Sequence, residues 1–256
     1  MPFAETITIA SLNTQMGRAI REPYGLKPLD GVDILLMQEV MMGGSELVDR
    51  VHDQIGLRIG QYDEELGLAI ALLPGQFITK HYKTVMQQRG LIGNSIDSNK
   101  EDMQKSRFRL RGRGLIGVSL VTSENNALSV ATTHPTVQLR QISRNRQVRK
   151  IAGAVAKVDH PLVLAGDMNH WPGPHSVDLR TYEETRLTPV NMPDKATFDV
   201  SRTRYAWLGK LAANFGVDMN GQLDAMLYRG LTVGATTLVD VSSDHSAIMT
   251  TFVLES

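Results

Sequence analysis

Short apolar runs recur along the whole chain, and their length and content of β-branched residues predict strands. We expect strands at residues 7–12, 32–38, 66–73, 114–121, 127–133, 162–165, 223–228, 231–239 and 247–254. Elsewhere apolar positions recur at helical spacing, which predicts helices over residues 46–55 and 138–158. Ser45 is a suitable N-cap for the first helix. The apolar side chains expected on one face of that helix are Leu47, Val48, Val51 and Ile55.

Many strands combined with few helices imply an α/β protein, in the form of a layered α/β sandwich. The runs at 66–73, 114–121 and 127–133 follow one another without an obvious helical crossover. Part of the sheet structure should therefore be antiparallel, unlike a doubly wound nucleotide-binding fold. The chain has no internal repeat, low-complexity tract or Pro/Gly/Ser-rich linker, so we expect one domain over residues 1–256.

The composition is that of an ordinary globular protein, with 256 residues, 42% hydrophobic and 21% charged. No apolar run approaches the roughly 20 residues of a membrane-spanning helix, and the N-terminus lacks the pattern of a secretory signal. We therefore expect a cytoplasmic protein without a transmembrane segment. The absence of cysteine excludes disulfides, thiolate metal sites and cysteine nucleophiles.

The formal net charge is zero, which argues against a protein that coats nucleic acid by bulk electrostatics. The charges are unevenly distributed, because residues 100–150 hold 11 basic and 3 acidic side chains. A basic segment between acidic flanks suits metal-binding carboxylates beside a surface for an anionic ligand. A solvated charged face is the simpler interpretation of the same pattern.

Several polar side chains stand where an apolar run ends. Asp167 and Asn169 follow the run at 162–165, two positions apart, so an extended chain would point both the same way. A carboxylate beside a carboxamide can accept a proton, orient a water molecule and hold a phosphate oxygen. The structural alternative for this Gly-Asp-Met-Asn sequence is an Asx-turn that closes the strand.

Three further acidic positions have comparable settings. Glu39 ends the run at 32–38, where it offers an oxygen ligand to a hard divalent cation unless it is simply solvated. Asp244 and His245 precede the last run and supply a metal or water ligand and a group that titrates near neutrality. Asp224 interrupts an otherwise apolar run, and a buried carboxylate there needs a partner, for which an imidazole is suitable.

Taken together, these positions resemble the ordered motifs of the endonuclease/exonuclease/phosphatase superfamily, the deoxyribonuclease I-like proteins. The resemblance spans residues 7–252, and two secondary matches support it: the run Gly67-Leu-Ala-Ile-Ala-Leu and the pair Arg144 and Gln147. The motifs that carry it are Ala-Ser-Leu-Asn13, Leu-Met-Gln-Glu39, Thr-Thr-His134, Gly-Asp167-Met-Asn169, Gln-Leu-Asp224 and Ser-Asp244-His245.

The resemblance implies a four-layered α/β sandwich, with two mixed β-sheets packed face to face and helices outside, and metal-dependent phosphoester hydrolysis. Glu39 would bind Mg2+ or Mn2+, with Asn13 close by and Asp244 as a further ligand. Asp167 would orient or deprotonate the attacking water. Asn169 and His134 would contact the scissile phosphate. His245, oriented by Asp224, would stabilise the charge that develops on phosphorus or transfer a proton.

Two features of the sequence bear on the substrate. In the segment 105–113 basic residues alternate with others, so an extended chain would place Arg107, Arg109 and Arg111 on one face. That face suits a nucleic-acid backbone, an inositol phosphate or an anionic lipid head group, or it is a solvated edge strand. Arg144 is a further substrate-binding candidate. Trp171 has the chemistry to stack on a base or sugar, and packing is its structural alternative.

These observations predict a Mg2+- or Mn2+-dependent phosphodiesterase, first of all a nuclease with endonuclease action on DNA or RNA. The alternative is a phosphatase or phospholipase C-like phosphodiesterase acting on inositol phosphate, sphingomyelin or another small or lipid phosphoester. Two departures from the exonuclease III-type members of the superfamily argue against a dedicated abasic-site enzyme. Gln15 stands where those members usually have an acidic residue, and His134-Pro135 stands where they have a Tyr- or Asn-based motif. A catalytically silent binding module is disfavoured, because every expected catalytic position is filled.

Overall fold

Two six-stranded β-sheets form the centre of the molecule in the computed structural model, which describes residues 5–77, 83–87, 114–122, 125–135, 141–169, 185–203, 206–214 and 220–254. The first sheet has the order β11-β12-β1-β2-β4-β3. Its strands are β1 (Glu5–Asn13), β2 (Ile34–Gln38), β3 (Arg58–Asp63), β4 (Leu68–Leu72), β11 (Thr232–Val239) and β12 (Ala247–Leu254). Only β1 and β2 pair in parallel, so the sheet is mixed.

The second sheet has the order β5-β6-β7-β8-β10-β9. Its strands are β5 (Lys83–Gln87), β6 (Leu115–Val121), β7 (Ala127–Thr133), β8 (Leu162–Asp167), β9 (Thr188–Pro189) and β10 (Asp224–Arg229). It is also mixed, because β7 and β8 pair in parallel while the other neighbours are antiparallel.

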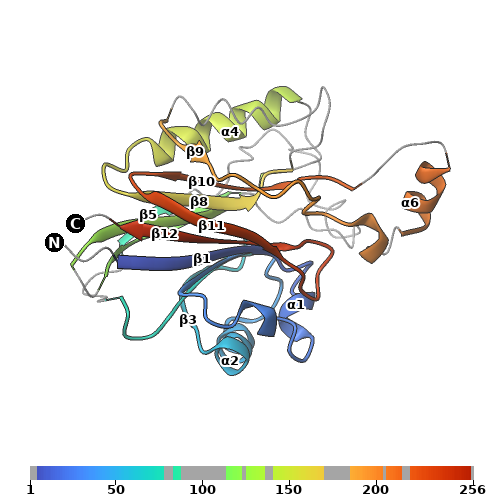
Figure 1. The fold of residues 1–256 in the computed structure, drawn as a ribbon, viewed down its shortest axis with the longest axis horizontal. Coiled ribbons are helices and arrows are strands. Elements are labelled where there is room, and N and C mark those ends of the chain that lie inside the picture. The colour runs from blue at the N-terminus through green and yellow to red at the C-terminus, as the bar shows by residue number, and fades with distance from the viewer. Residues whose placement is uncertain are drawn as a thin grey trace, which may run out of the picture.

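Helices cover the outer faces of both sheets, which gives four layers (Figure 1). In that view α4 (Gln141–Val155) lies above the sheets, and α2 (Gly44–Ile55) lies below them with α1 (Arg18–Arg21). The helix α6 (Ala206–Ala213) projects from one end of the sandwich (Figure 1). Two 3-10 turns complete the set, η1 (Lys27–Leu29) and η2 (Val200–Arg202).

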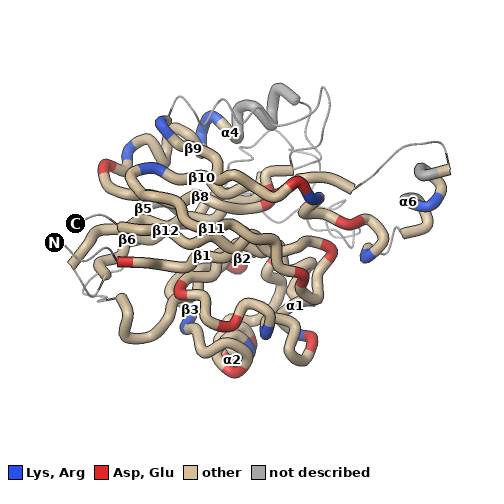
Figure 2. The backbone as a smooth tube through the Cα atoms, in the orientation of Figure 1, with Lys and Arg blue, Asp and Glu red and all other residues tan. Residues whose placement is uncertain are grey.

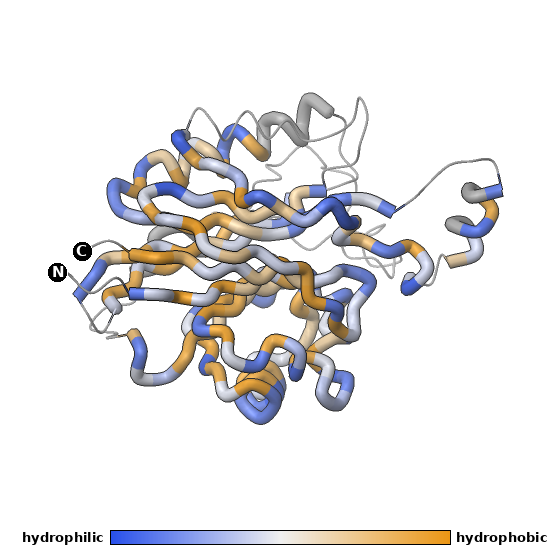
Figure 3. Tube along the Cα trace, in the orientation of Figure 1, coloured by the Kyte–Doolittle hydropathy of each residue, from blue (hydrophilic) through white to orange (hydrophobic). Residues whose placement is uncertain are grey.

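Three apolar clusters correspond to the three spaces between the layers. Ile9 and Ile70 of the first sheet belong to the same cluster as Val130 and Val163 of the second, so the sheets pack face to face. A second cluster joins Met37 and other residues of the first sheet to Leu47 and Val51 of α2. A third joins Leu115, Ala131, Leu162 and Leu164 of the second sheet to Ile151 and Val155 of α4. Hydrophobic segments consequently run along the strands of the sheets, while most charged positions lie in the helices, in the loops and at the strand ends (Figures 2 and 3).

The fold confirms the predicted four-layered α/β sandwich and its partly antiparallel sheets. Every predicted run forms a strand, because the inner strands are buried on one or both faces and therefore read as apolar. The sequence did not indicate β3, β5 and β9, which are the last strands at their ends of the two sheets. Edge strands are half exposed, so they need no apolar run.

The two helix predictions need small corrections. Gly43, not Ser45, is the N-cap residue of α2, and no side chain caps this helix. Val48 is 44% exposed, whereas Leu47, Val51 and Ile55 are buried as expected. The second helix is described from Gln141 to Val155 and ends three residues before the predicted end. No helix in the described ranges has the length and apolar character to cross a membrane.

Both parallel pairs point their C-terminal ends to the same edge of the sandwich, the end from which α6 projects (Figure 1). The antiparallel strands β10 and β12 begin at that edge, because Asp224 pairs with Asp167 and Ser11 pairs with Ile248. The polar residues found at the strand ends in the sequence therefore lie together at one edge.

Candidate active site

Asp167 is the last residue of β8 and is at the centre of the polar cluster at this edge. The strand reaches this position because Gly166 has no side chain: a Cβ there would lie 1.9 Å from the carbonyl oxygen of Thr133 in the neighbouring β7. Asp167 is only 3% exposed. Its carboxylate accepts a 3.0 Å hydrogen bond from Asn13 Nδ2 and a 2.9 Å bond from the backbone N–H of Asn169.

The bond from Asn169 N–H to Asp167 Oδ1 is the Asx-turn that the sequence offered as the structural alternative. It does not exclude a place in the site, because Asn169 is itself buried in the cluster at 4% exposure. Its backbone has a φ of 52°, in the left-handed region, and its Nδ2 donates a 2.7 Å bond to the carbonyl oxygen of Pro135. The turn fixes the directions of both side chains.

His134 stands between two acidic side chains. It follows β7, is 2% exposed, and places its Nε2 3.3 Å from Asp167 Oδ2 and 3.8 Å from Glu39 Oε1. The imidazole therefore links the end of β8 in the second sheet to the end of β2 in the first. Glu39 and Asp167, 128 positions apart in sequence, meet around this ring.

The charges around Asp167 favour its ionised form. Burial by itself raises the pKa of this carboxyl, whereas the charge and hydrogen bond of His134 lower it. The charge of His245 and the Asn169 N–H act in the same direction and hold the pKa of Asp167 well below its usual range. His245 Nε2 lies 3.9 Å from Asp167 Oδ2.

The predicted pairing of Asp224 with an imidazole is present. His245 Nδ1 lies 2.7 Å from Asp224 Oδ2, and both residues are 4% exposed. Burial disfavours the imidazolium, but the charge and hydrogen bond of Asp224 raise the pKa of His245 to about 10. The carboxylates of Asp167 and Asp244 act in the same direction. This arrangement leaves Nε2 of His245 directed to the side of Asp167.

Glu39 and Asp244 are the two remaining carboxylates of the cluster. Glu39 has a φ of 54°, an uncommon backbone conformation for a non-glycine residue, and its side chain is 23% exposed. Asp244 is half-buried, and burial raises its pKa. The charge of His245 lowers that pKa, and the nearby negative charge of Glu39 raises it. A cation between Glu39 and Asp244 would relieve their repulsion.

The carboxylates at this edge could supply only part of the coordination of a magnesium-type ion. Within the described ranges, no group of three or more acidic or histidine side chains could hold a metal ion alone. Mg2+ is usually held by one or two carboxylates, with water and substrate phosphate oxygens completing the coordination. Glu39 and Asp244 match that requirement in number and in oxygen chemistry.

Both polar atoms of the Asn13 side-chain amide form hydrogen bonds within the protein. Its Nδ2 donates to Asp167, and its Oδ1 accepts a 3.0 Å bond from the backbone N–H of Gln15. The observed contacts make Asn13 an orienting partner of Asp167. The role of Asn13 as a metal ligand, which the motif resemblance implied, stays a prediction.

Gln38, next to Glu39, ties the two sheets together beneath the site. Its Nε2 donates a 2.7 Å bond to Thr132 Oγ1 of the second sheet and a 3.2 Å bond to Ser11 Oγ of the first. Its buried Oε1 has no hydrogen-bond partner. The sequence indicated this residue only as part of the Gln-Glu pair at the strand end.

Three residues near the site escaped the sequence analysis: Thr197, Phe198 and Asp199. They lie outside regular strands, and their backbones bond to the segments that carry Asp224 and His245. The ring of Phe198 lies 5.1 Å from that of His245, centroid to centroid. A threonine and a phenylalanine in an irregular segment carry no chemical signal of their own, so only the fold reveals their position.

None of the predicted substrate-binding side chains is among those that the structure describes. Arg107, Arg109, Arg111 and Trp171 lie outside the described residues, as does the side chain of Arg144. Trp207, on α6, is 61% exposed, so it is not a packing residue of the core. The substrate-binding roles of the four arginines and of Trp171 stay predictions.

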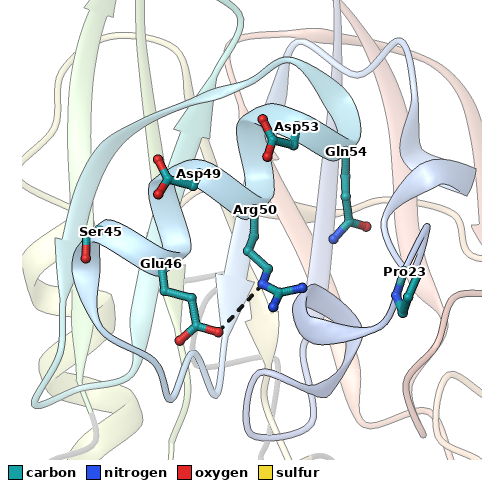
Figure 4. Close-up of a pocket in the computed structure, with 7 residues that line it drawn as sticks. All are labelled: Pro23, Ser45, Glu46, Asp49, Arg50, Asp53 and Gln54. Carbon is teal, nitrogen blue, oxygen red and sulfur yellow. Dashed lines mark ion pairs between the residues drawn. The ribbon is translucent and has the colours of Figure 1, made fainter.

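An open pocket of about 540 Å3 lies away from the site, on the outer helix layer (Figure 4). It is lined by Pro23, Ser45, Glu46, Asp49, Arg50, Asp53 and Gln54, and the figure shows the ion pair between Glu46 and Arg50. None of the strand-end residues contributes to it, so it is not part of the candidate site.

Comparison with known proteins identifies the class of fold. No protein-family model matches the sequence, and no curated protein matches it. The structure, however, superposes on those of endonuclease/exonuclease/phosphatase proteins over nearly its whole length. The fold is therefore the deoxyribonuclease I-like sandwich of that superfamily, as the motif resemblance indicated.

Three solved structures illustrate the similarity. An endonuclease/exonuclease/phosphatase family protein from Bacteroides thetaiotaomicron matches with a TM-score of 0.71, 12% identity, and coverage of 99% of this chain and 100% of that one. ANGEL2, a 2',3'-cyclic phosphatase, matches with a TM-score of 0.64 and 15% identity, over 99% of this chain and 96% of that one. The inositol polyphosphate 5-phosphatase domain of SpSynaptojanin was solved with inositol (1,4)-bisphosphate and calcium. It matches with a TM-score of 0.62 and 15% identity, over 98% of this chain and 85% of that one.

Proposed function

We propose that this protein hydrolyses phosphoesters with the help of a divalent cation, Mg2+ or Mn2+. The observation that carries the proposal is the meeting of Asp167, His134 and the Asp224–His245 pair beside the carboxylates of Glu39 and Asp244. One side of this cluster supplies cation ligands and the other supplies imidazoles and an oriented carboxylate. An anionic phosphoester needs both, because hydroxide is repelled by its charge.

The residues would divide the chemistry as follows. Glu39 and Asp244 would hold the cation, which supplies neutralisation of the non-bridging phosphate oxygens. Asp167 has both oxygens directed by Asn13 and by the Asn169 N–H, so it is suited to orient the attacking water. His134, whose Nε2 lies 3.3 Å from Asp167 Oδ2, would contact the same water or a phosphate oxygen.

His245 would act on the developing charge. Its pKa, raised to about 10, keeps the imidazolium at neutral pH, and Asp224 fixes the ring through Nδ1. The positive charge and the free direction of Nε2 suit stabilisation of the additional negative charge on the phosphoryl oxygens in the transition state, or donation of a proton to the leaving oxygen. The side chain of Asn169 would add a contact to the phosphate.

The first substrate that we propose is a phosphodiester of DNA or RNA, cleaved internally. The basic alternation that includes Arg107, Arg109 and Arg111 supports this choice, because such a row neutralises successive phosphates. A small or lipid phosphoester is the second candidate, and the zero net charge favours it. The similar structures named as phosphatases support this second candidate as well.

Purified protein with Mg2+ or Mn2+ tests the proposal against supercoiled plasmid, single-stranded RNA, inositol phosphates and sphingomyelin vesicles. We expect nicking of the plasmid, its loss with EDTA, and its loss in Asp167→Ala. Turnover of only a small or lipid phosphoester would replace the nuclease by the second candidate. Absence of hydrolysis of every substrate, together with absence of cation binding, would contradict the enzyme proposal itself.

A further inference from the structure

The Asp224–His245 pair joins two strands that no β-ladder connects. Asp224 begins β10 of the second sheet, and His245 lies two residues before β12 of the first. Their 2.7 Å contact therefore depends on how the two sheets are held relative to each other at this edge. Whatever joins the chain segments 221–224 and 244–246 also sets the distance between the carboxylate and the imidazole.

The segment 197–199 makes that connection through its backbone. The carbonyl of Thr197 accepts a 2.7 Å bond from Ser246 N–H, and Asp199 N–H donates a 2.9 Å bond to the carbonyl of Asp244. Between them, Phe198 N–H donates a 2.9 Å bond to the carbonyl of Gly221. Isolated β-bridges pair Phe198 with both Gly221 and His245. The segment thus lies between the two loops as a short third strand.

Two side chains of the segment act on the pair itself. Thr197 Oγ1 accepts bonds from the backbone N–H groups of Leu223 (3.0 Å) and Asp224 (3.2 Å). Thr197 is 1% exposed, so water cannot replace these bonds if the hydroxyl is removed. The ring of Phe198 lies against that of His245, with the ring centroids 5.1 Å apart and the ring planes inclined by 58°.

We propose that Thr197 and Phe198 are positioning residues: they hold the Asp224 carboxylate and the His245 ring in register from one segment that spans the two sheets. The expected change in turnover rests on the proposed hydrolytic function. The expected change in the position of the Asp224–His245 pair does not. Because Thr197 and Phe198 act through Asp224 and His245, their removal should lower the turnover number and leave the binding of substrate nearly unchanged.

Thr197→Val is the main test, because it keeps the shape of the side chain and removes the acceptor. We expect kcat to fall by about ten- to a hundredfold, the range for losing an outer partner of a site residue, with KM within about threefold. Thr197→Ser keeps the hydroxyl and should recover most of kcat. Thr250→Val, which removes another buried hydroxyl bond, to Thr236, is the matched control and should leave kcat unchanged.

A double-mutant cycle shows whether the effect passes through His245. If it does, Thr197→Val added to His245→Gln lowers kcat little further, since neighbours in one network are not additive. A full additional loss in that background would overturn the proposal, as would an unchanged kcat in the single variant. Phe198→Leu, which keeps an apolar side chain of moderate size, should behave in the same way as Thr197→Val.

A spectroscopic measurement separates this proposal from the proposed function. In proton NMR spectra of the wild type, the His245 Nδ1–H held by Asp224 should give a downfield resonance, assigned by its loss in His245→Gln. Thr197→Val should shift or broaden that resonance, while Thr250→Val leaves it in place. If no phosphoester is hydrolysed, this comparison still decides the positioning role, and an unchanged resonance in Thr197→Val would refute it.

Discussion

Asn13 Nδ2 donates a 3.0 Å hydrogen bond to Asp167 Oδ2, across 154 positions of sequence. The two residues end β1 of the first sheet and β8 of the second, so this bond crosses the sandwich at the edge that carries the site. Together with the bond of Gln38 to Thr132, it ties the two sheets where their strands end. The direction of the Asp167 carboxylate is consequently set from the opposite sheet.

Replacement of Asn13 by alanine should reduce both stability and hydrolysis. The change leaves the buried Asp167 Oδ2 without its amide donor and Gln15 N–H without its acceptor, at a cost of about 1–3 kcal/mol. We expect a lower denaturation midpoint in urea and about a tenfold or greater fall in kcat. Asn126→Ala, which removes a 3.3 Å bond to Glu5, is the control, and equal losses of kcat in the two variants would contradict the role of Asn13.

Gly166→Ala should disturb the site through the backbone. A Cβ at position 166 would lie 1.9 Å from the carbonyl oxygen of Thr133, so β7 and β8 must separate next to His134 and Asp167. Overpacking of this kind costs typically about 1–3 kcal/mol. Gly153→Ala, in α4 with open space around the new methyl, should instead be neutral or stabilising by up to about 1 kcal/mol. Thermal denaturation of the two variants makes the comparison, and tolerance of alanine at 166 would show that the strands are not held at this spacing.

The stability that His245 contributes should depend on pH in a defined window. Its pKa is raised to about 10 in the folded protein, whereas the pKa of a histidine in an unfolded chain is about 6.5. Between these values the folded state binds more protons, so this contribution is complete below the unfolded pKa and is lost as pH rises through the folded one. The difference in Tm between wild type and His245→Gln should therefore be largest at pH 6 and should narrow towards pH 10.

The matched control for this pH series is His52→Gln, since His52 lies on the exposed side of α2. Its Tm should follow that of the wild type across the series. A constant difference between wild type and His245→Gln would mean that the imidazole is not held as the cation beside Asp224.

Divalent cations should stabilise the folded protein if Glu39 and Asp244 bind them. An ion at a hundredfold excess over its Kd adds about 2.7 kcal/mol, or roughly 5–10 °C in Tm for a chain of this size. Glu39→Gln should remove most of this shift, and isothermal titration with Mn2+ should show weaker binding. Glu46→Gln, in the acidic pocket on α2, should keep the shift. A shift that survives Glu39→Gln but not Glu46→Gln would place the cation in that pocket instead.

Much of the fold could be predicted because the inner strands of a sheet are buried, and burial requires an apolar sequence regardless of which strands are the neighbours. The runs that became β2, β4 and β8 are wholly buried, so their composition alone marks them as strands. The edge strand β3 has only one buried residue, Asp63, and left no such mark. The N-cap at Gly43 was also missed. Ser45 has the right chemistry for a cap, but the helix begins at Gly44, one residue before it.

The sequence by itself determined which chemical groups are present at the strand ends and in which order, because side-chain chemistry and local periodicity are properties of short segments. The tertiary structure alone decided that Asp167 is directed by Asn13, that His134 stands between two carboxylates, and that Thr197 spans the segments of Asp224 and His245. These contacts join residues from different sheets. Their distances depend on how the two sheets pack, which no local pattern in the chain records.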